Sequence, residues 1–69
     1  MTLTPVSSSN IAAVGYDKES QTLGIEFRSG GTYEYFDVPE SVYESFIQSA
    51  SLGKFFQTEL RGRYRYVRR

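Results

Sequence analysis

The side chains that could do chemistry in this chain gather at its C-terminal end, where arginines alternate with tyrosines. Residues 54–69 carry six basic side chains and one acidic one, a net charge of +5. Residues 1–53 carry two basic and seven acidic side chains, a net charge of −5, so the total of zero hides a strong separation of charge. Guanidinium groups can bind phosphates, and interleaved aromatic rings can stack bases. This combination indicates contact with an anionic partner, most often a nucleic acid.

The candidate nucleic-acid-binding residues are the basic and tyrosine side chains of this segment. If the segment is a strand, Arg63 and Arg65 share one face and Tyr64, Tyr66 and Arg68 share the other. The alternative is a solvated basic strand that protects a sheet edge, or one that pairs with Glu26 or Glu34 of the acidic half. The full candidate set is Lys54, Arg61, Arg63, Tyr64, Arg65, Tyr66, Arg68 and Arg69.

Tyr33 and Tyr35 are a second aromatic pair, with either a stacking or a core role. On a sheet face they could stack bases, as aromatic residues do in RNA-binding sheets. They could equally pair across a hairpin with Ile25 and Phe27 and form the core. A chain of this length buries only about 60% of the surface that its unfolded form exposes, so it needs its large rings inside. We favour the core role, with the hydroxyls able to reach the surface.

An enzyme is not expected from this composition. The chain has no cysteine and no histidine, which removes the thiolate and imidazole ligands of a zinc site, and no metal or cofactor is expected. The serines at positions 7–9 and Ser51 lack the usual neighbouring base that activates a serine nucleophile. Capping and turn hydrogen bonds are the better interpretation of these hydroxyls.

The most regular pattern is a hairpin from Thr22 to Val38. From Thr22 to Arg28, large apolar residues alternate with threonine, glycine or charged residues, which is typical of a half-buried strand. Residues 32–38 are rich in aromatic and β-branched side chains and are predicted to form the return strand. Ser29-Gly30-Gly31 suits the tight connection. Residues 11–16 fit a first strand, and residues 1–5 are expected to be a flexible lead-in.

Helical signals follow the hairpin. Pro39 and Glu40 suit the start of a helix of about 11 residues, with an apolar stripe. Ser51 can cap a shorter helix that Gly62 would end, and 64–67 reads as a final strand. The stripe consists of Val42, Phe46 and Ala50, flanked by Tyr43 and Ile47, and the shorter helix carries Phe55, Phe56 and Leu60.

These elements predict an α+β fold in one domain spanning residues 1–69. A small antiparallel sheet, built from a three-strand meander plus a C-terminal strand, would carry one main helix and a short second helix on one face. The side chains expected to be mostly buried are Leu23, Ile25, Phe27, Tyr33, Tyr35, Val42, Phe46, Ile47, Phe56 and Leu60.

The same residues, taken in order, resemble the KTSC domain family. This short domain is found alone in bacterial and phage-type proteins and at the C-terminus of some lysyl-tRNA synthetases. The resemblance implies a single compact domain and adds to the case for RNA, but it implies no established activity, and Arg68-Arg69 matches nothing in the family pattern. The matching elements are Val6-Ser7-Ser8-Ser9-Asn10-Ile11, Gly15-Tyr16-Asp17, Leu23, Ile25, Phe27, Gly30, Tyr33-Glu34-Tyr35, Val38-Pro39 and Ala50-Ser51 with Gly53 and Phe55-Phe56.

The sequence therefore predicts a small non-catalytic module that binds RNA or another single-stranded nucleic acid through its basic end. The alternative is a protein-interaction module that docks a partner through a sheet edge or an aromatic patch. No signal peptide is expected, because the N-terminal residues lack a basic region followed by an apolar one, and no apolar run approaches the roughly 20 residues that a membrane span needs. We expect a cytoplasmic monomer with no membrane partner.

Overall fold

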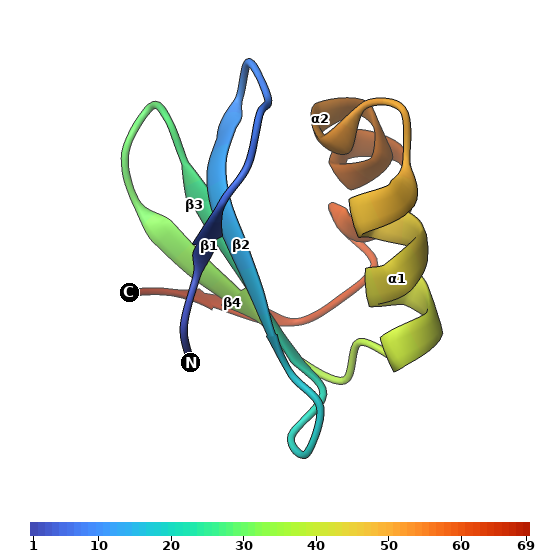
Figure 1. The fold of residues 1–69 in the computed structure, drawn as a ribbon. Helices are drawn as coiled ribbons and strands as arrows, with labels where there is room; N and C mark the ends of the chain where they lie inside the picture. Colours follow the sequence, from blue (N-terminus) through green and yellow to red (C-terminus); the bar gives the residue numbers. More distant parts are fainter.

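Five antiparallel strands form one sheet in the computed structural model, which describes residues 1–69, and the helices cover one face of this sheet (Figure 1). The spatial order of the strands is their order in the chain, so the helices form the connection between the fourth and the fifth. The predicted α+β class is confirmed. The elements are β1 (Thr4–Pro5), β2 (Ile11–Asp17), β3 (Thr22–Phe27), β4 (Thr32–Tyr35), α1 (Glu40–Gln48), α2 (Leu52–Phe55), the π-helical turn η1 (Phe56–Leu60) and β5 (Tyr66–Arg68).

The predicted hairpin is present as β3 and β4. Gly30 and Gly31 have φ angles of 111° and 90°, which favour glycine, and they complete the connection. The register places Tyr35 opposite Leu23 and Tyr33 opposite Ile25. The cross-strand partners are therefore Leu23 and Ile25 rather than Ile25 and Phe27, and Phe27 lies at the end of the hairpin beside its turn.

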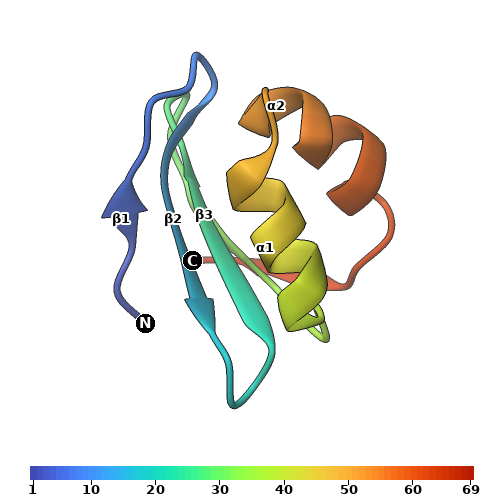
Figure 2. The same cartoon turned by 45° about the vertical axis from the view of Figure 1, so that its right-hand side comes forward.

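The N-terminal strand β1 was not expected from the sequence. Thr4 pairs with Val14 and Pro5 with Ala13, on the outer edge of β2. The segment before β1 then lies on the face of the sheet that the helices leave open (Figure 2). A Cβ atom at Gly24 would lie 2.7 Å from the Met1 sulfur, so this glycine lets the N-terminal segment approach the sheet closely.

Helix α1 is shorter than predicted and faces the core differently. Pro39 occupies the N-cap position, and its carbonyl accepts the Val42 amide at 3.0 Å. The helix ends at Gln48, where the Ser49 hydroxyl donates to the Phe46 carbonyl at 2.7 Å. Phe46 is fully buried at the centre of the contact, whereas Ile47 is 43% exposed. The prediction that Ile47 is buried is wrong, because successive helical residues point about 100° apart.

The second helical segment begins and ends where the sequence predicts. The Ser51 hydroxyl accepts the Lys54 amide at 3.2 Å, as an N-cap does, and Gly62 follows the segment with a φ of 79°. Its second half widens into η1, which the sequence did not indicate. The final strand comprises Tyr66–Arg68 instead of 64–67, because residues 61–64 are used in the turn that follows η1.

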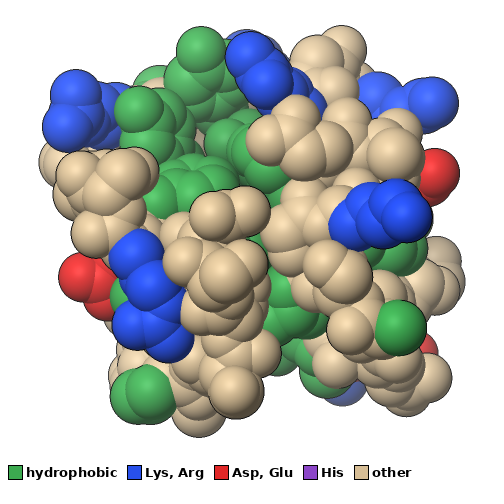
Figure 3. All heavy atoms as spheres, turned by 90° about the horizontal axis from the view of Figure 1, so that it is seen from above, with side chains coloured by type: hydrophobic (Ala, Val, Ile, Leu, Met, Phe, Trp, Pro, Cys, Tyr) green, Lys and Arg blue, Asp and Glu red, His purple; other side chains and the backbone are tan.

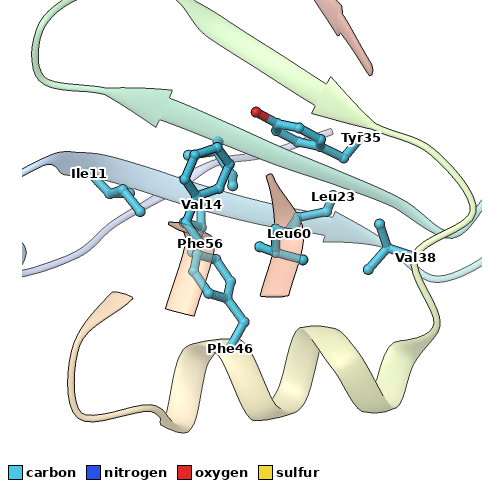
Figure 4. Close-up of a cluster of buried hydrophobic side chains, with 9 residues drawn as sticks. Ile11, Val14, Leu23, Tyr35, Val38, Phe46, Phe56 and Leu60 are labelled. Atoms are coloured by element: carbon cyan, nitrogen blue, oxygen red, sulfur yellow. The ribbon is translucent and has the colours of Figure 1, made fainter. Parts of the chain in front are cut away.

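The core lies between the sheet and the helices, with contributions from β2, β3, β4, α1 and η1 (Figure 4). Phe27, Tyr33 and Val42, expected to be mostly buried, are only partly buried and pack against the cluster from its edge. No helix has the length and apolar character to cross a membrane. The buried cluster consists of Ile11, Val14, Leu23, Ile25, Tyr35, Val38, Phe46, Phe56 and Leu60.

Candidate nucleic-acid interface

Five aromatic rings form a closed cycle of contacts at one end of the sheet. Each ring contacts the next at a centroid distance between 5.1 and 5.8 Å. The rings line a cleft of about 270 Å³, which we call the aromatic cleft. The sequence brings them together because β4 presents two residues to this end and β3, β5 and η1 present one each. In order around the cycle they are Phe27, Tyr33, Tyr66, Tyr35 and Phe56.

The rings differ in how accessible they are. Tyr35 and Phe56 are 4% and 8% exposed and belong to the core, so the core role predicted for Tyr35 is confirmed. Tyr33 is half-buried, and Tyr66 is 56% exposed. Tyr66 is therefore the ring that a ligand can reach most easily.

Two arginines of the basic segment lie beside the aromatic cleft. Arg61 is among the lining residues, and its Nη1 donates to Gln57 Oε1 at 3.0 Å. The Arg68 guanidinium lies 5.9 Å from the centre of the Tyr33 ring, within the range of a cation–π contact. Neither arginine forms an ion pair with a carboxylate. Figure 3 looks down on this end of the molecule and shows hydrophobic side chains in a hollow with Lys and Arg side chains around it.

A second, more polar cleft of about 520 Å³ adjoins the first and shares Phe27, Ser29 and Phe56 with it. Its walls include Asn10 and Arg28. The Arg28 Nε donates to the Ser8 carbonyl at 2.6 Å, which fixes this side chain across the β1–β2 connection. No acidic side chain lines either cleft. We call the two clefts together the groove.

Other members of the basic segment lie on the open face of the sheet. Val67 is opposite Glu34, so alternate residues of β5 point away from the helices. Arg69 forms an ion pair with Glu34 at 2.8 Å, and the Arg65 guanidinium lies 5.3 Å from the centre of the Phe36 ring. Neutralisation by the acidic half therefore occurs at Arg69; the alternative pairing expected for Arg63 or Arg65 with Glu26 or Glu34 does not occur.

The remaining candidate residues lie apart from both groups. Arg63 and Tyr64 are in the turn after η1 and line a shallow depression beside α1, where the Arg63 Nε donates to the Thr58 carbonyl at 3.2 Å. Lys54 is exposed on α2. The segment that is continuous in sequence thus divides over three surfaces. The structure brings together Arg61, Tyr66 and Arg68 with Tyr33, and leaves the others elsewhere.

Burial raises the pKa of Tyr35 to about 12, with further increases from the neighbouring Tyr66 and Tyr33 and an opposing effect of the Arg61 charge. The Tyr35 hydroxyl is thus neutral at pH 7 and can both donate and accept a hydrogen bond. Because no buried polar side-chain atom is left without a partner, and this hydroxyl has none in the protein, it reaches the surface at the cleft. A buried ring with a surface hydroxyl is the mixed role that the sequence allowed.

Sequence reasoning missed the part of the groove that comes from the first half of the chain. Arg28 and Asn10 were not candidates, and Phe27 and Phe56 were expected only in the core. The available signal was the position of Phe27 and Arg28 directly before the glycine turn, which places them at the end of a hairpin. No three His, Cys, Asp or Glu side chains are close enough to hold a metal ion.

Comparisons with known proteins give a consistent result. The sequence model of the KTSC domain matches residues 7–64. The crystal structure of a KTSC domain protein from Yersinia pestis is 38% identical, covers 99% of this chain and 96% of its own, and superposes with a TM-score of 0.96. A protein of Tsukamurella paurometabola is 40% identical over 63 residues, 91% of this chain and 94% of that protein. A lysine–tRNA ligase of Nostoc punctiforme is 41% identical over 56 residues, which are 81% of this chain but only 10% of the ligase.

Proposed function

The chain belongs to the KTSC domain family, and we propose that it is a small non-catalytic RNA-binding module that uses its basic C-terminal segment. One observation carries the proposal. Of the six basic side chains in residues 54–69, five have no carboxylate partner in the folded protein. Folding therefore leaves most of the positive charge available to an external anion.

The zero net charge of the chain does not oppose this proposal. The molecule measures 28 × 24 × 22 Å along its principal axes. At physiological ionic strength the Debye length is about 8 Å, so exposed charges on opposite sides of such a molecule hardly sense each other. A phosphate chain at the basic surface would respond to the local field and not to the total charge.

The likeness to part of a lysine–tRNA ligase supports an RNA partner, since that enzyme is named for an RNA substrate. The chain spans about a tenth of the ligase's length, so the ligation activity itself is not carried over. An RNA partner also agrees with the cytoplasmic location expected from the sequence. The absence of cysteine and histidine favours a binding role over a catalytic one.

An amide NMR titration with mixed-sequence single-stranded RNA, at low and at moderate salt, tests the proposal. We expect shifts in residues 54–69 that diminish as salt rises, because counterion release drives binding of this kind. The same titration with a polyanion such as heparin shows whether RNA is preferred over negative charge alone. The proposal fails if no amide shifts at low salt.

A second candidate function, docking of a partner protein, is favoured by the exposed edge at β5. Tyr66 and Val67 are 56% and 37% exposed on an edge strand, and such an edge can pair with an additional strand. This role predicts association that is insensitive to salt, or a dimer in sedimentation equilibrium. A monomer that binds RNA and no protein partner would exclude it.

A further inference from the structure

We propose that the groove takes one unpaired nucleotide, with its base stacked on Tyr66 and its flanking phosphates on Arg61 and Arg68. This inference deepens the proposed function and rests on it, because it names single-stranded nucleic acid as the ligand class and the groove as its site. The arginines and tyrosines that are on other surfaces then have at most a secondary part in binding.

The aromatic cleft has a ring that is both held and accessible. Tyr66 contacts Tyr33 and Tyr35 at centroid distances of 5.8 and 5.5 Å, and it is nevertheless 56% exposed. A ring supported by two others loses little freedom when a base stacks on it, so most of the stacking energy remains as affinity. Core aromatics such as Phe56, at 8% exposed, have no comparable free surface.

The shape of the groove selects an unpaired base. The two adjoining clefts measure about 270 and 520 Å³; the second is within the range of about 300–1,000 Å³ that small-ligand sites occupy, and the first is just below it. Bases in a duplex are stacked on each other and cannot enter a concave site of this kind. A nucleotide in a loop, a bulge or a single strand can place its base there.

The polar cleft provides groups for the edge of a base. The Asn10 side-chain amide makes no hydrogen bond within the protein, although it lies at the wall of the groove. Gly53 leaves room for it, since a Cβ atom at this position would be 3.1 Å from Asn10 Nδ2. The Gln57 amide is nearby and uses its oxygen to hold Arg61, which leaves its nitrogen as a donor.

Charge at the groove complements a nucleotide. Arg28 and Arg61 line it, and Arg68 lies over Tyr33 at its edge, whereas no acidic side chain lines either cleft. The nearest ion pair of the basic segment, Arg69 with Glu34, is on the open face of the sheet. A phosphate chain that passes the groove therefore meets positive charge on both sides of the base.

The test compares the binding of two probes to four variants by fluorescence anisotropy. The probes are a labelled oligouridylate of about eight nucleotides, near the length that one small domain covers, and an RNA duplex of the same length. The variants are Tyr66→Ala, Tyr66→Leu, Tyr66→Phe and Tyr64→Ala. Tyr66→Leu retains apolar bulk against Tyr33 and Tyr35 without a π face, and Tyr64→Ala removes a tyrosine of the same segment from a different surface. Thermal melting checks that each variant is folded.

We expect the oligouridylate to bind more tightly than the duplex. Loss of one stacking ring in Tyr66→Ala and Tyr66→Leu should weaken oligouridylate binding by about 5- to 150-fold, while Tyr66→Phe stays near wild type. Tyr64→Ala, if it is folded, should keep the affinity for the oligouridylate near wild type, because this ring lies on a different surface. Equal affinity for the duplex, or unchanged affinity in folded Tyr66→Leu, would overturn this inference while RNA binding itself stands. Absence of binding to both probes at low salt would instead reject the proposed function.

Discussion

Two double substitutions that remove the same charge from the same segment should have different effects on RNA binding. Arg61→Ala with Arg68→Ala removes both C-terminal arginines beside the groove. Arg65→Ala with Arg69→Ala removes both arginines of the open face. Each pair changes the formal net charge from 0 to −2. A difference between them therefore reports position and not total charge.

The magnitude follows from counterion release. Each phosphate contact to a single strand contributes about −0.7 to the slope of log K against log salt concentration, so contacts to the three groove arginines, Arg28, Arg61 and Arg68, give a slope of about −2.1. Loss of the contacts to Arg61 and Arg68 should reduce the slope to about −0.7. The open-face pair should leave the slope within about 0.3 of wild type, because one of its arginines is already paired with Glu34 and both point away from the groove.

The assay is anisotropy of the labelled oligouridylate at salt concentrations from about 50 to 200 mM. Breaking the exposed Arg69–Glu34 pair costs at most about 1 kcal/mol, and Arg61 and Arg68 are exposed and form no ion pair, so both double variants should remain folded; melting curves verify this. Equal slopes in the two double variants would refute the assignment of the phosphates to the groove. A larger loss in the open-face pair would move the site to the other side of the sheet.

Three further predictions concern the scaffold. Phe46→Ala should destabilise the fold by about 3–5 kcal/mol, because this fully buried ring joins α1 to the sheet; denaturant unfolding measures it, and a midpoint near wild type would contradict the core. Gly15→Ala should cost about 1–3 kcal/mol in the same assay, since the new Cβ would lie 2.9 Å from a Leu3 methyl carbon and against the Thr2 carbonyl. The raised pKa of Tyr35 means that its hydroxyl holds the proton more tightly in the native state than in the unfolded chain, where the pKa is near 10.0. The contribution of this hydroxyl to the free energy of unfolding is therefore complete below pH 10 and is lost as pH rises from about 10 to about 12. The free energy of unfolding should fall less steeply over this pH range in Tyr35→Phe.

Local sequence patterns predicted which segments form strands and helices better than they predicted how these segments pair and pack. The β3–β4 hairpin followed from an alternation of apolar residues and a glycine turn, both of which are properties of neighbouring residues. Strand β1 has only two residues and no apolar pattern, and it forms because it pairs with β2. The local sequence therefore gives no signal for this strand. The burial of Ile47 was predicted wrongly because the packing of Phe46 sets the rotation of α1 about its axis. An apolar stripe on a helix does not show which of its residues faces the core most directly.

The candidate interface was predictable in composition but not in shape. The sequence located the basic side chains but left open whether the acidic half neutralises them; in the folded protein five of the six have no carboxylate partner. Their division over three surfaces follows from how the turn at Gly62 and the short β5 are placed against the sheet, and this placement depends on tertiary packing. Phe27 and Arg28 enter the groove only because the hairpin end meets η1, a contact between residues far apart in the chain.

The aromatic cleft has a floor of core residues, Tyr35 and Phe56, and a rim of exposed residues, Arg61, Tyr66 and Arg68. This division determines at which residues a substitution can test binding without also changing the stability of the fold. Tyr35 and Phe56 are in the buried cluster, so a change at either alters the free energy of unfolding together with the shape of the cleft. Tyr66, Arg61 and Arg68 are exposed. A binding site in a domain of this size has to lie at the edge of the core, because the interior is too small to hold a separate pocket. Loss of binding in a floor variant is therefore ambiguous, and only rim variants can separate recognition from folding.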